Sequence, residues 1–172
     1  MDILLPSAEI SPPLHSACLF LLAKLISTKW RFFFPGNVLD TIFEQQKLPK
    51  IENEEVLTKI LNYFIAAIIS TDLTLSRNAL SALLDLHKER KIFAHGAVRV
   101  KFNPPIAEAI TKSLTAGQHY IIQDELIQLL YYTVMNNSAN NVQNTIQQAL
   151  PKKLHVSFSK KIFLIFRKMA KM

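Results

Sequence analysis

The feature that most constrains the fold is a pair of amphipathic stretches between Glu52 and Arg90, separated by the break Ser70-Thr71-Asp72. In each stretch apolar residues recur at intervals of three and four, the spacing of one face of an α-helix. These positions are Leu57, Ile60, Leu61, Phe64, Ile65 and Ile68 in the first stretch and Leu73, Leu80, Leu83 and Leu84 in the second. A break this short makes the helices antiparallel, and Thr71 or Asp72 can cap the second one. Because the hairpin cannot cover both of its apolar faces itself, the rest of the chain must supply neighbours.

The prolines divide the rest of the chain into helical segments. All eight lie in or beside gaps between apolar-periodic stretches, and glycine is scarce at three residues. Proline lacks a backbone N–H and clashes with the preceding turn, so it marks helix boundaries. Asn103 is predicted to cap the helix that Pro104 opens. The further predicted helices are Leu14–Lys29, Val38–Lys47, Pro104–Ala116, Tyr120–Asn136, Ala139–Leu150 and Ser157–Lys171.

One stretch, Lys91–Asn103, has no clear helical period. We interpret it as an irregular linker or the frayed start of the next helix, with a short strand as the alternative, because Val98, Val100 and Phe102 alternate with polar residues.

The predicted helices pair into about four antiparallel hairpins, whose starts recur at spacings comparable with HEAT and armadillo units. No residue-level repeat is visible, and a closed bundle would also be built from antiparallel hairpins. We predict an all-α fold, an α-α superhelix of the HEAT/ARM-like solenoid type. It would form a single helical-repeat domain over 1–172, with an N-terminal extension (1–13), helical hairpins (14–150) and a basic amphipathic tail helix (151–172).

The net charge of +7 is confined to the end of the sequence. Residues 1–150 carry equal numbers of basic and acidic residues, whereas the last 22 hold seven basic residues and no acid. This basic end can be a solvated helix face, a patch for an acidic protein or nucleic acid, or an amphipathic helix on a membrane surface. Its candidate partner-binding residues are Lys160, Lys161, Arg167 and Lys168.

A second candidate surface is the aromatic cluster from Trp30 to Phe34, which also contains Arg31. Aromatic residues and arginine dominate binding hot spots, so Trp30 and Arg31 are candidate anchors for a partner. The alternative is a packing role, in which the cluster fills the seam between helices Leu14–Lys29 and Val38–Lys47.

No pattern in the sequence indicates catalysis. The five histidines (His15, His87, His95, His119 and His155) lack metal-ligand spacing and are predicted to lie at the surface or half-buried. Cys18, the single cysteine, excludes an internal disulfide and is predicted to be buried and inert. There is no phosphate-binding glycine loop and no nucleophile elbow. We therefore predict a protein that is not an enzyme, with no catalytic residue, cofactor, metal or small-molecule substrate.

Three stretches of the sequence resemble the C-terminal repeats of the karyopherin-β exportins. Ala17–Phe34 is an aliphatic helix leading into a Trp-Arg-Phe-Phe-Phe cluster, Leu75–Phe93 is similar to the family's long second helix, and Asp124-Glu125-Leu126 is the third match. Within the family the pattern is most similar to the exportin-six branch, the carriers of actin–profilin. The sequence departs from the family at Pro104-Pro105, where the family continues a helix, and after Pro151, where the tail matches poorly.

The resemblance implies a protein-binding segment of a nuclear export receptor. In that family a large solenoid binds protein cargo together with GTP-bound Ran, through the full-length receptor, and shuttles between nucleus and cytoplasm. The amino-terminal repeats that grip Ran in such receptors have no counterpart in this sequence. From a different class, the alternative is a free-standing helical scaffold whose basic C-terminal helix docks to membrane or RNA.

Overall fold

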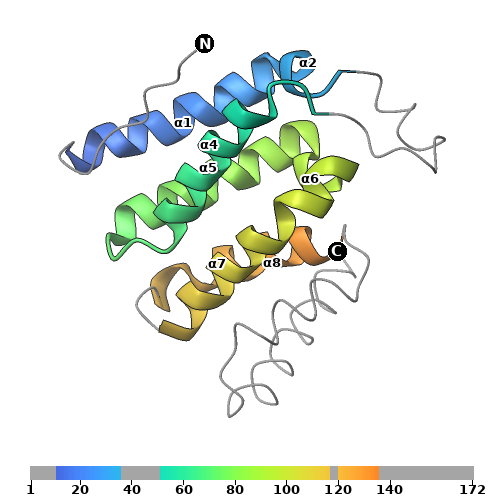
Figure 1. Ribbon diagram of the computed structural model, residues 1–172. Coiled ribbons are helices and arrows are strands. Elements are labelled where there is room, and N and C mark those ends of the chain that lie inside the picture. Colours follow the sequence, from blue (N-terminus) through green and yellow to red (C-terminus); the bar gives the residue numbers. More distant parts are fainter. Residues whose placement is uncertain (1–10, 36–50, 117–119, 136–172) are drawn as a thin grey trace.

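The computed structural model describes residues 11–35, 51–116 and 120–135, and within these ranges all regular structure is helical (Figure 1). The all-α fold class is therefore confirmed. The helices are α1 (Pro12–Thr28), α2 (Trp30–Phe33), α4 (Glu54–Ile68), α5 (Leu73–Arg90), α6 (Gly96–Lys101), α7 (Asn103–Ala116) and α8 (Gln123–Met135), with 3₁₀ turns at Ile92–Ala94 and Tyr120–Ile122. None of these helices is long and apolar enough to cross a bilayer.

The central hairpin is formed by α4 and α5, as predicted, and α5 has the predicted boundaries. The Asp72 carboxylate caps α5 by accepting hydrogen bonds from the backbone N–H groups of Thr74 (2.8 Å) and Leu75 (3.1 Å). These groups have no partner inside the helix, so the cap satisfies two of them. The Ser76 hydroxyl then donates to the carbonyl of Ile68 at 3.0 Å, which joins the start of α5 to the end of α4.

The remaining described helices lie on both sides of this hairpin (Figure 1). On one side α1 packs along α5, and on the other α7 contacts α4 while α8 contacts α5. The apolar faces of all these helices meet in one continuous core, including the predicted face of α8. Hairpins that pack on neighbours in chain order are the arrangement of a helical-repeat array.

The structure corrects the prediction for residues 91–103, which are neither an irregular linker nor a strand. Lys91 ends α5 with a left-handed backbone (φ 53°), and a 3₁₀ turn and α6 follow. The buried apolar residues of this stretch recur at intervals of four and five, as on one face of a helix, and include Phe93, Ala97, Val98 and Phe102. Val100, by contrast, is 50% exposed. The alternation of apolar residues, which suggested a strand, was therefore the wrong periodicity to use for this stretch.

The prediction that Asn103 caps α7 is also wrong. Asn103 is the first residue of α7 and is fully buried. Its side-chain amide donates to the carbonyls of Phe93 (3.0 Å) and Thr133 (3.2 Å). The side chain therefore ties α7 to the preceding 3₁₀ turn and to α8, because a buried amide needs partners wherever the fold offers them.

His87 is buried, with 4% of its surface exposed, which corrects its predicted surface or half-buried position. Its ring stacks on Phe93 (centroids 5.1 Å apart) and lies against Tyr132 (4.5 Å). Its Nδ1 accepts a hydrogen bond from the backbone N–H of Phe93 at 3.3 Å. Burial, with a smaller contribution from the Lys91 charge, lowers the pKa of His87 from 6.5 to about 4.

Several predictions fall outside the described residues. These are the helices 38–47, 139–150 and 157–171, most of the extension 1–13, and with them the fourth hairpin and the basic tail helix. The division of the chain into these parts stays a prediction.

Replacing Leu80 with Asp should unfold the protein. Leu80 is fully buried in the core, and an unpaired carboxylate there costs about 4 kcal/mol or more, comparable with the stability of a domain. The matched control is Ser81→Asp, since Ser81 is the exposed neighbour on the same helix. Circular dichroism melts should show loss of helicity for Leu80→Asp alone. Equal melting temperatures would mean that the core-facing side of α5 is assigned wrongly.

Stability should fall as the pH is lowered from about 6.5 towards 4. Because the pKa of His87 in the folded state lies below its ordinary value of 6.5, folding favours the neutral ring. The contribution of the neutral His87 ring to the free energy of unfolding is complete above pH 6.5. As the pH falls and protons bind the unfolded chain, up to about 3 kcal/mol of it is lost. Urea denaturation across this range measures the slope, and His87→Gln should flatten it. An unchanged slope in that variant would show that other groups carry the pH dependence.

Candidate interaction surface

The aromatic cluster from Trp30 to Phe34 divides into a buried and an exposed half. It forms the single-turn helix α2 directly after α1, with Phe33 and Phe34 in the core and Arg31 and Phe32 exposed. The carbonyl of Phe33 accepts from the backbone N–H of Glu52 at 2.9 Å. The Asn53 side chain donates to the carbonyl of Phe32, also at 2.9 Å. The exposed surface of the cluster is therefore held in place by the segment leading into α4.

Trp30 is half-buried and packs within an aromatic group of three rings. Its ring lies 4.1 Å from Phe34 and 6.2 Å from His95, and His95 lies 4.4 Å from Phe34. His95 is the residue before α6, and burial lowers its pKa. The described partners of the cluster are thus the start of α6 and the segment before α4. The predicted seam with a helix at 38–47 lies outside the described residues.

Arg31 is the exposed cation of this surface, and within the described part of the chain no carboxylate pairs with it. Its guanidinium, with the neighbouring ring of Phe32, offers the arginine and aromatic pair that is common in hot spots. Of the two candidate residues on α2, the structure places Arg31 towards solvent and Trp30 partly in the packing. A partner-binding role for either stays a prediction.

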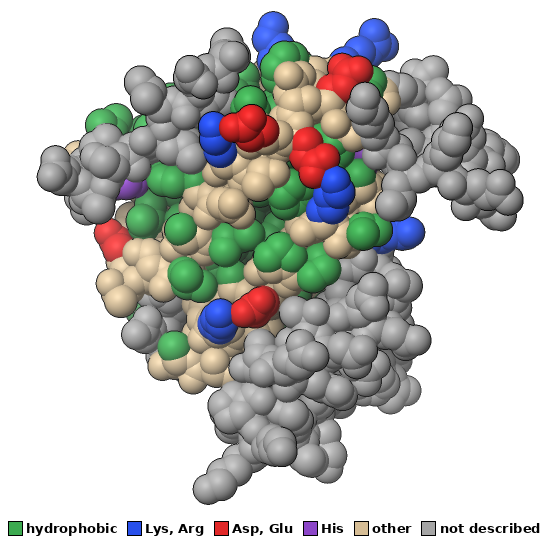
Figure 2. All heavy atoms as spheres, in the orientation of Figure 1, with side chains coloured by type: hydrophobic (Ala, Val, Ile, Leu, Met, Phe, Trp, Pro, Cys, Tyr) green, Lys and Arg blue, Asp and Glu red, His purple; other side chains and the backbone are tan. Residues whose placement is uncertain are grey.

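The four basic candidates of the tail, Lys160, Lys161, Arg167 and Lys168, lie outside the described residues. On the described part, Figure 2 shows charged side chains that occur mostly as neighbours of opposite sign around an apolar centre. Examples of such pairs are Glu55–Lys59 (2.9 Å) and Glu108–Lys112 (2.7 Å). Exposed pairs of this kind contribute little to stability and leave no patch of one sign on the visible described surface.

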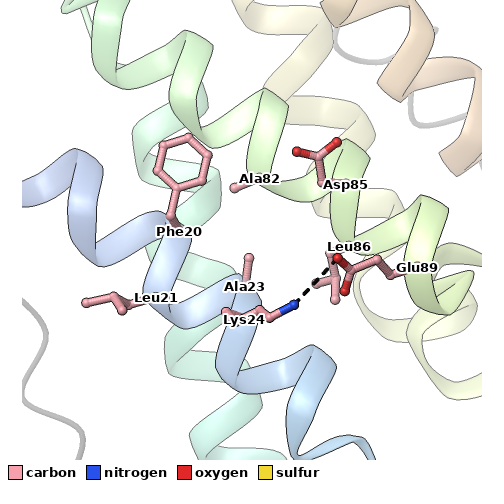
Figure 3. A pocket seen from close by; sticks show the side chains of 8 residues that line it. All are labelled: Phe20, Leu21, Ala23, Lys24, Ala82, Asp85, Leu86 and Glu89. Atoms are coloured by element: carbon pink, nitrogen blue, oxygen red, sulfur yellow. Dashed lines mark ion pairs between the residues drawn. The ribbon is translucent and has the colours of Figure 1, made fainter.

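A groove that the sequence reasoning missed lies between α1 and α5 (Figure 3). It encloses about 370 Å³, and its apolar lining comes from Phe20, Leu21 and Ala23 on α1 and from Ala82 and Leu86 on α5. Phe20 and Leu21 remain exposed, although Leu19, Leu22, Ala23 and Ile26 already form the buried stripe of α1. These exposed apolar residues form a second apolar stripe that is visible in the sequence. Because a surface helix normally has only one apolar stripe, the second one was the signal that could have predicted the groove.

The polar end of the groove is a small network around Glu89. Its carboxylate accepts from the Ser27 hydroxyl at 2.5 Å and pairs with the Lys24 ammonium at 3.7 Å. The hydrogen bond from Ser27, and then the charge of Lys24, lower the pKa of Glu89. Glu89 is therefore ionised at neutral pH, and the network joins the end of α1 to that of α5.

The other reactive side chains of the described residues include a histidine–tyrosine pair and a cysteine. His15 and Tyr63 are hydrogen-bonded through Nδ1 and the hydroxyl, and burial, with a smaller contribution from Cys18, raises the pKa of Tyr63 to about 12. Cys18, which was predicted to be buried, is half-buried. No group of histidine, cysteine and carboxylate side chains in these ranges could hold a metal ion.

Antiparallel helical hairpins stacked in chain order, with an apolar groove and an exposed aromatic and arginine surface, define a helical-repeat protein. The family model described as "Exportin-6, C-terminal TPR repeats" matches residues 26–170. The chain belongs to this family. This confirms the resemblance to the exportins. The match begins at Ile26, inside Ala17–Phe34, the first of the three stretches on which the resemblance was based.

Individual relatives agree with the family model. Exportin-6-A and Exportin-6-B of Xenopus laevis are each 22% identical to the chain over 116 residues, covering 67% of it. The chain spans about a tenth of the length of these curated relatives. No solved structure matches.

Replacing Trp30 with Ala should destabilise the protein, whereas replacing Arg31 with Ala should not. The loss of the half-buried indole between Phe34 and His95 should cost about 2 kcal/mol. Removal of the exposed guanidinium should change the free energy of unfolding by less than about 0.5 kcal/mol. Urea denaturation measures both. If Trp30→Ala is as stable as the wild type, the indole is not a packing residue.

Proposed function

We propose that this chain is a carboxy-terminal segment of an exportin-type nuclear transport receptor and supplies part of the wall that binds protein cargo together with GTP-bound Ran. The observation that carries the proposal is the family model of exportin-6 C-terminal repeats, which matches most of the chain. The whole receptor would shuttle between nucleus and cytoplasm. The chain itself would act by binding and not by catalysis.

The packing of the described residues supports a binding role with long-range coupling. α5 contacts α1 on one side and α8 on the other, so a displacement of one end must pass through the central hairpin. In an array whose units contact only their neighbours, small changes at each interface add up to a change in curvature. Two partners that favour the same curvature bind with positive coupling.

A pull-down with and without Ran locked in its GTP form tests the proposal. The immobilised full-length receptor that contains this segment is incubated with cell extract, because the segment itself lacks the repeats that grip Ran, and bound proteins are quantified by mass spectrometry. We expect the recovery of a protein partner to rise about fivefold or more when GTP-locked Ran is added, within the usual range of coupling energies. GDP-bound Ran and a full-length receptor with the Leu80→Asp change in this segment are the controls. Equal recovery under all conditions would contradict the proposal.

The second candidate is a free-standing helical scaffold whose basic end docks to membrane or RNA, and the confinement of the net charge to residues 151–172 favours it. Binding of this kind releases counterions and weakens steeply with salt. We expect capture by the exportin-type mechanism to change little between 50 and 200 mM salt, the range over which phosphate-driven binding falls about a thousandfold. A chain with Gln at Lys160, Lys161, Arg167 and Lys168 should keep its protein partner under the first proposal and lose RNA or vesicles under the second.

A further inference from the structure

The basic side chains of the described region that form no ion pair gather at one edge of the helical array. Six of the described lysines and arginines are paired with carboxylates. The remaining ones lie at the end of α1, in α2, at the end of α5 and in α6, and all of them are exposed. We call this set the basic edge, and its members are Lys29, Arg31, Arg90, Lys91 and Arg99.

Two of the helices that form the basic edge end side by side. The groove between α1 and α5 is lined by residues at matching positions along both helices, so the two run parallel. Near their ends the Ser27 hydroxyl donates to the Glu89 carboxylate, and the Arg90 Nε donates to the Ser27 hydroxyl at 3.4 Å. Lys29 follows the end of α1, and Lys91 follows the end of α5. These cations therefore lie at the same end of the helix pair.

The aromatic group around Trp30 brings α2 and α6 to this edge. The Trp30 ring lies 6.2 Å from His95, which directly precedes α6, and Figure 1 shows α2 and α6 on the same side of the array. Arg31 is the residue after Trp30. The backbone N–H of Arg99 donates to the carbonyl of His95 at 2.8 Å, so Arg99 lies one helical turn beyond His95 on the same face. Arg31 and Arg99 thus flank one aromatic group.

The basic edge carries an excess of positive charge. Of the described carboxylates beside it, Glu54 and Glu89 are already paired with lysines, and Glu52 forms no ion pair. Five unpaired cations against one unpaired carboxylate leave an excess of four positive charges. The carboxyl ends of α1 and α5 each contribute only about half a negative charge, which leaves most of this excess uncompensated.

The rest of the chain does not supply the complementary charge. The segment 36–50, which follows α2 in the sequence, contains two acidic and two basic residues. All residues outside the described ranges together hold four acidic and nine basic residues. Since the chain is positive as a whole, the complement of the basic edge is an anionic segment of another molecule.

We propose that the basic edge binds an acidic segment of a protein partner, in which carboxylates are interspersed with apolar side chains. Arginine guanidinium groups bind carboxylates through two parallel hydrogen bonds, and the edge contains three of them. Apolar surface lies between the cations, because Phe32 beside Arg31 is 40% exposed and Val100 beside Arg99 is 50% exposed. The inference rests on the proposed function in that the partner is a protein, and it adds the chemistry by which that partner is recognised.

The geometry favours an acidic protein segment over a nucleic acid. Proteins that bind single strands offer a row of exposed rings on which successive bases stack. At the basic edge Trp30, Phe34 and His95 lie against one another instead, with Phe34 buried and Trp30 half-buried. A protein bound to a duplex neutralises roughly six to ten phosphates, which is more than the excess charge of this edge.

A labelled synthetic peptide in which glutamates are interspersed with leucines is the probe for this site. Fluorescence anisotropy with the full chain measures its dissociation constant. Arg31→Gln, Lys91→Gln and Arg99→Gln, combined in one variant, remove three charges of the basic edge and should raise the dissociation constant about tenfold or more. A peptide with glutamine in place of glutamate should not bind.

The matched control removes three charges elsewhere on the described surface. Lys59→Gln, Arg77→Gln and Lys112→Gln, combined in one variant, break exposed ion pairs and lower the net charge by the same amount. This variant should leave the dissociation constant within about twofold of the starting value, since its charges lie away from the edge. Circular dichroism checks that both variants fold.

The basic end of the chain is removed from the comparison in the same way. Both variants and their parent carry Gln at four tail positions, so that the tail does not compete for the peptide; these are Lys160, Lys161, Arg167 and Lys168.

Three results would overturn the proposal. The first is a parent chain that does not bind the acidic peptide or binds the glutamine peptide equally well. The second is an equal dissociation constant in the edge variant and the control variant. The third is a single-stranded oligothymidine of the same charge that binds at least as tightly as the peptide and is lost in the edge variant, which would assign the edge to nucleic acid.

The peptide measurement uses neither Ran nor the rest of the receptor, so its failure is separate from failure of the proposed function. A receptor that recovers its partner with GTP-locked Ran, in a protein whose segment ignores the acidic peptide, would remove the basic edge and leave the transport role. A segment that binds the peptide, within a receptor whose recovery is independent of Ran, would do the reverse.

Discussion

The structure depends on the apolar seam of the α4–α5 hairpin. Leu57, Ile60, Leu61 and Phe64 of α4 and Leu80 and Leu83 of α5 are all without exposed surface. Because a helix pair buries only the faces turned towards each other, the seam extends into contacts with α1 on one side and with α7 and α8 on the other. The hydrophobic effect is proportional to the apolar area removed from water, and α1, α7 and α8 each bury apolar surface against this hairpin.

Buried polar groups fix how the neighbours sit on the hairpin. Asn103 joins α7 to the segment after α5 and to α8, and His87 is held by the backbone N–H of Phe93. Each of these groups would lose hydrogen bonds if its helix slid along the next one, and a buried unpaired polar group costs about 1–3 kcal/mol. The apolar core provides most of the driving force, and these few bonds select the register.

The exportin-6 family membership and the exposed surface of α1 describe different parts of one protein. The family model begins at Ile26, whereas the apolar face with Leu14 and Leu21 precedes it on α1. A helical array buries its units against one another, and an exposed apolar patch marks a contact surface. The proposed transport role therefore rests on the stacked hairpins.

The sequence by itself determined the helices of the described region that have strong local signals. The three-and-four spacing of α4, α5 and α8 and the cap at Asp72 are encoded within a few residues, and they are found as predicted. The candidate surface was predicted in part, since the cluster from Trp30 to Phe34 was singled out but not its division into buried and exposed halves.

The tertiary structure alone decided the short elements and the fate of single polar side chains. The segment 91–103 is helical because Phe93, Val98 and Phe102 meet a core built by distant helices, and Asn103 bonds to the carbonyl of Thr133, thirty residues away. The groove between α1 and α5 depends in the same way on two helices that are far apart in the sequence. Local propensity cannot specify such features, because their free energy comes from contacts that exist only once the helices have packed.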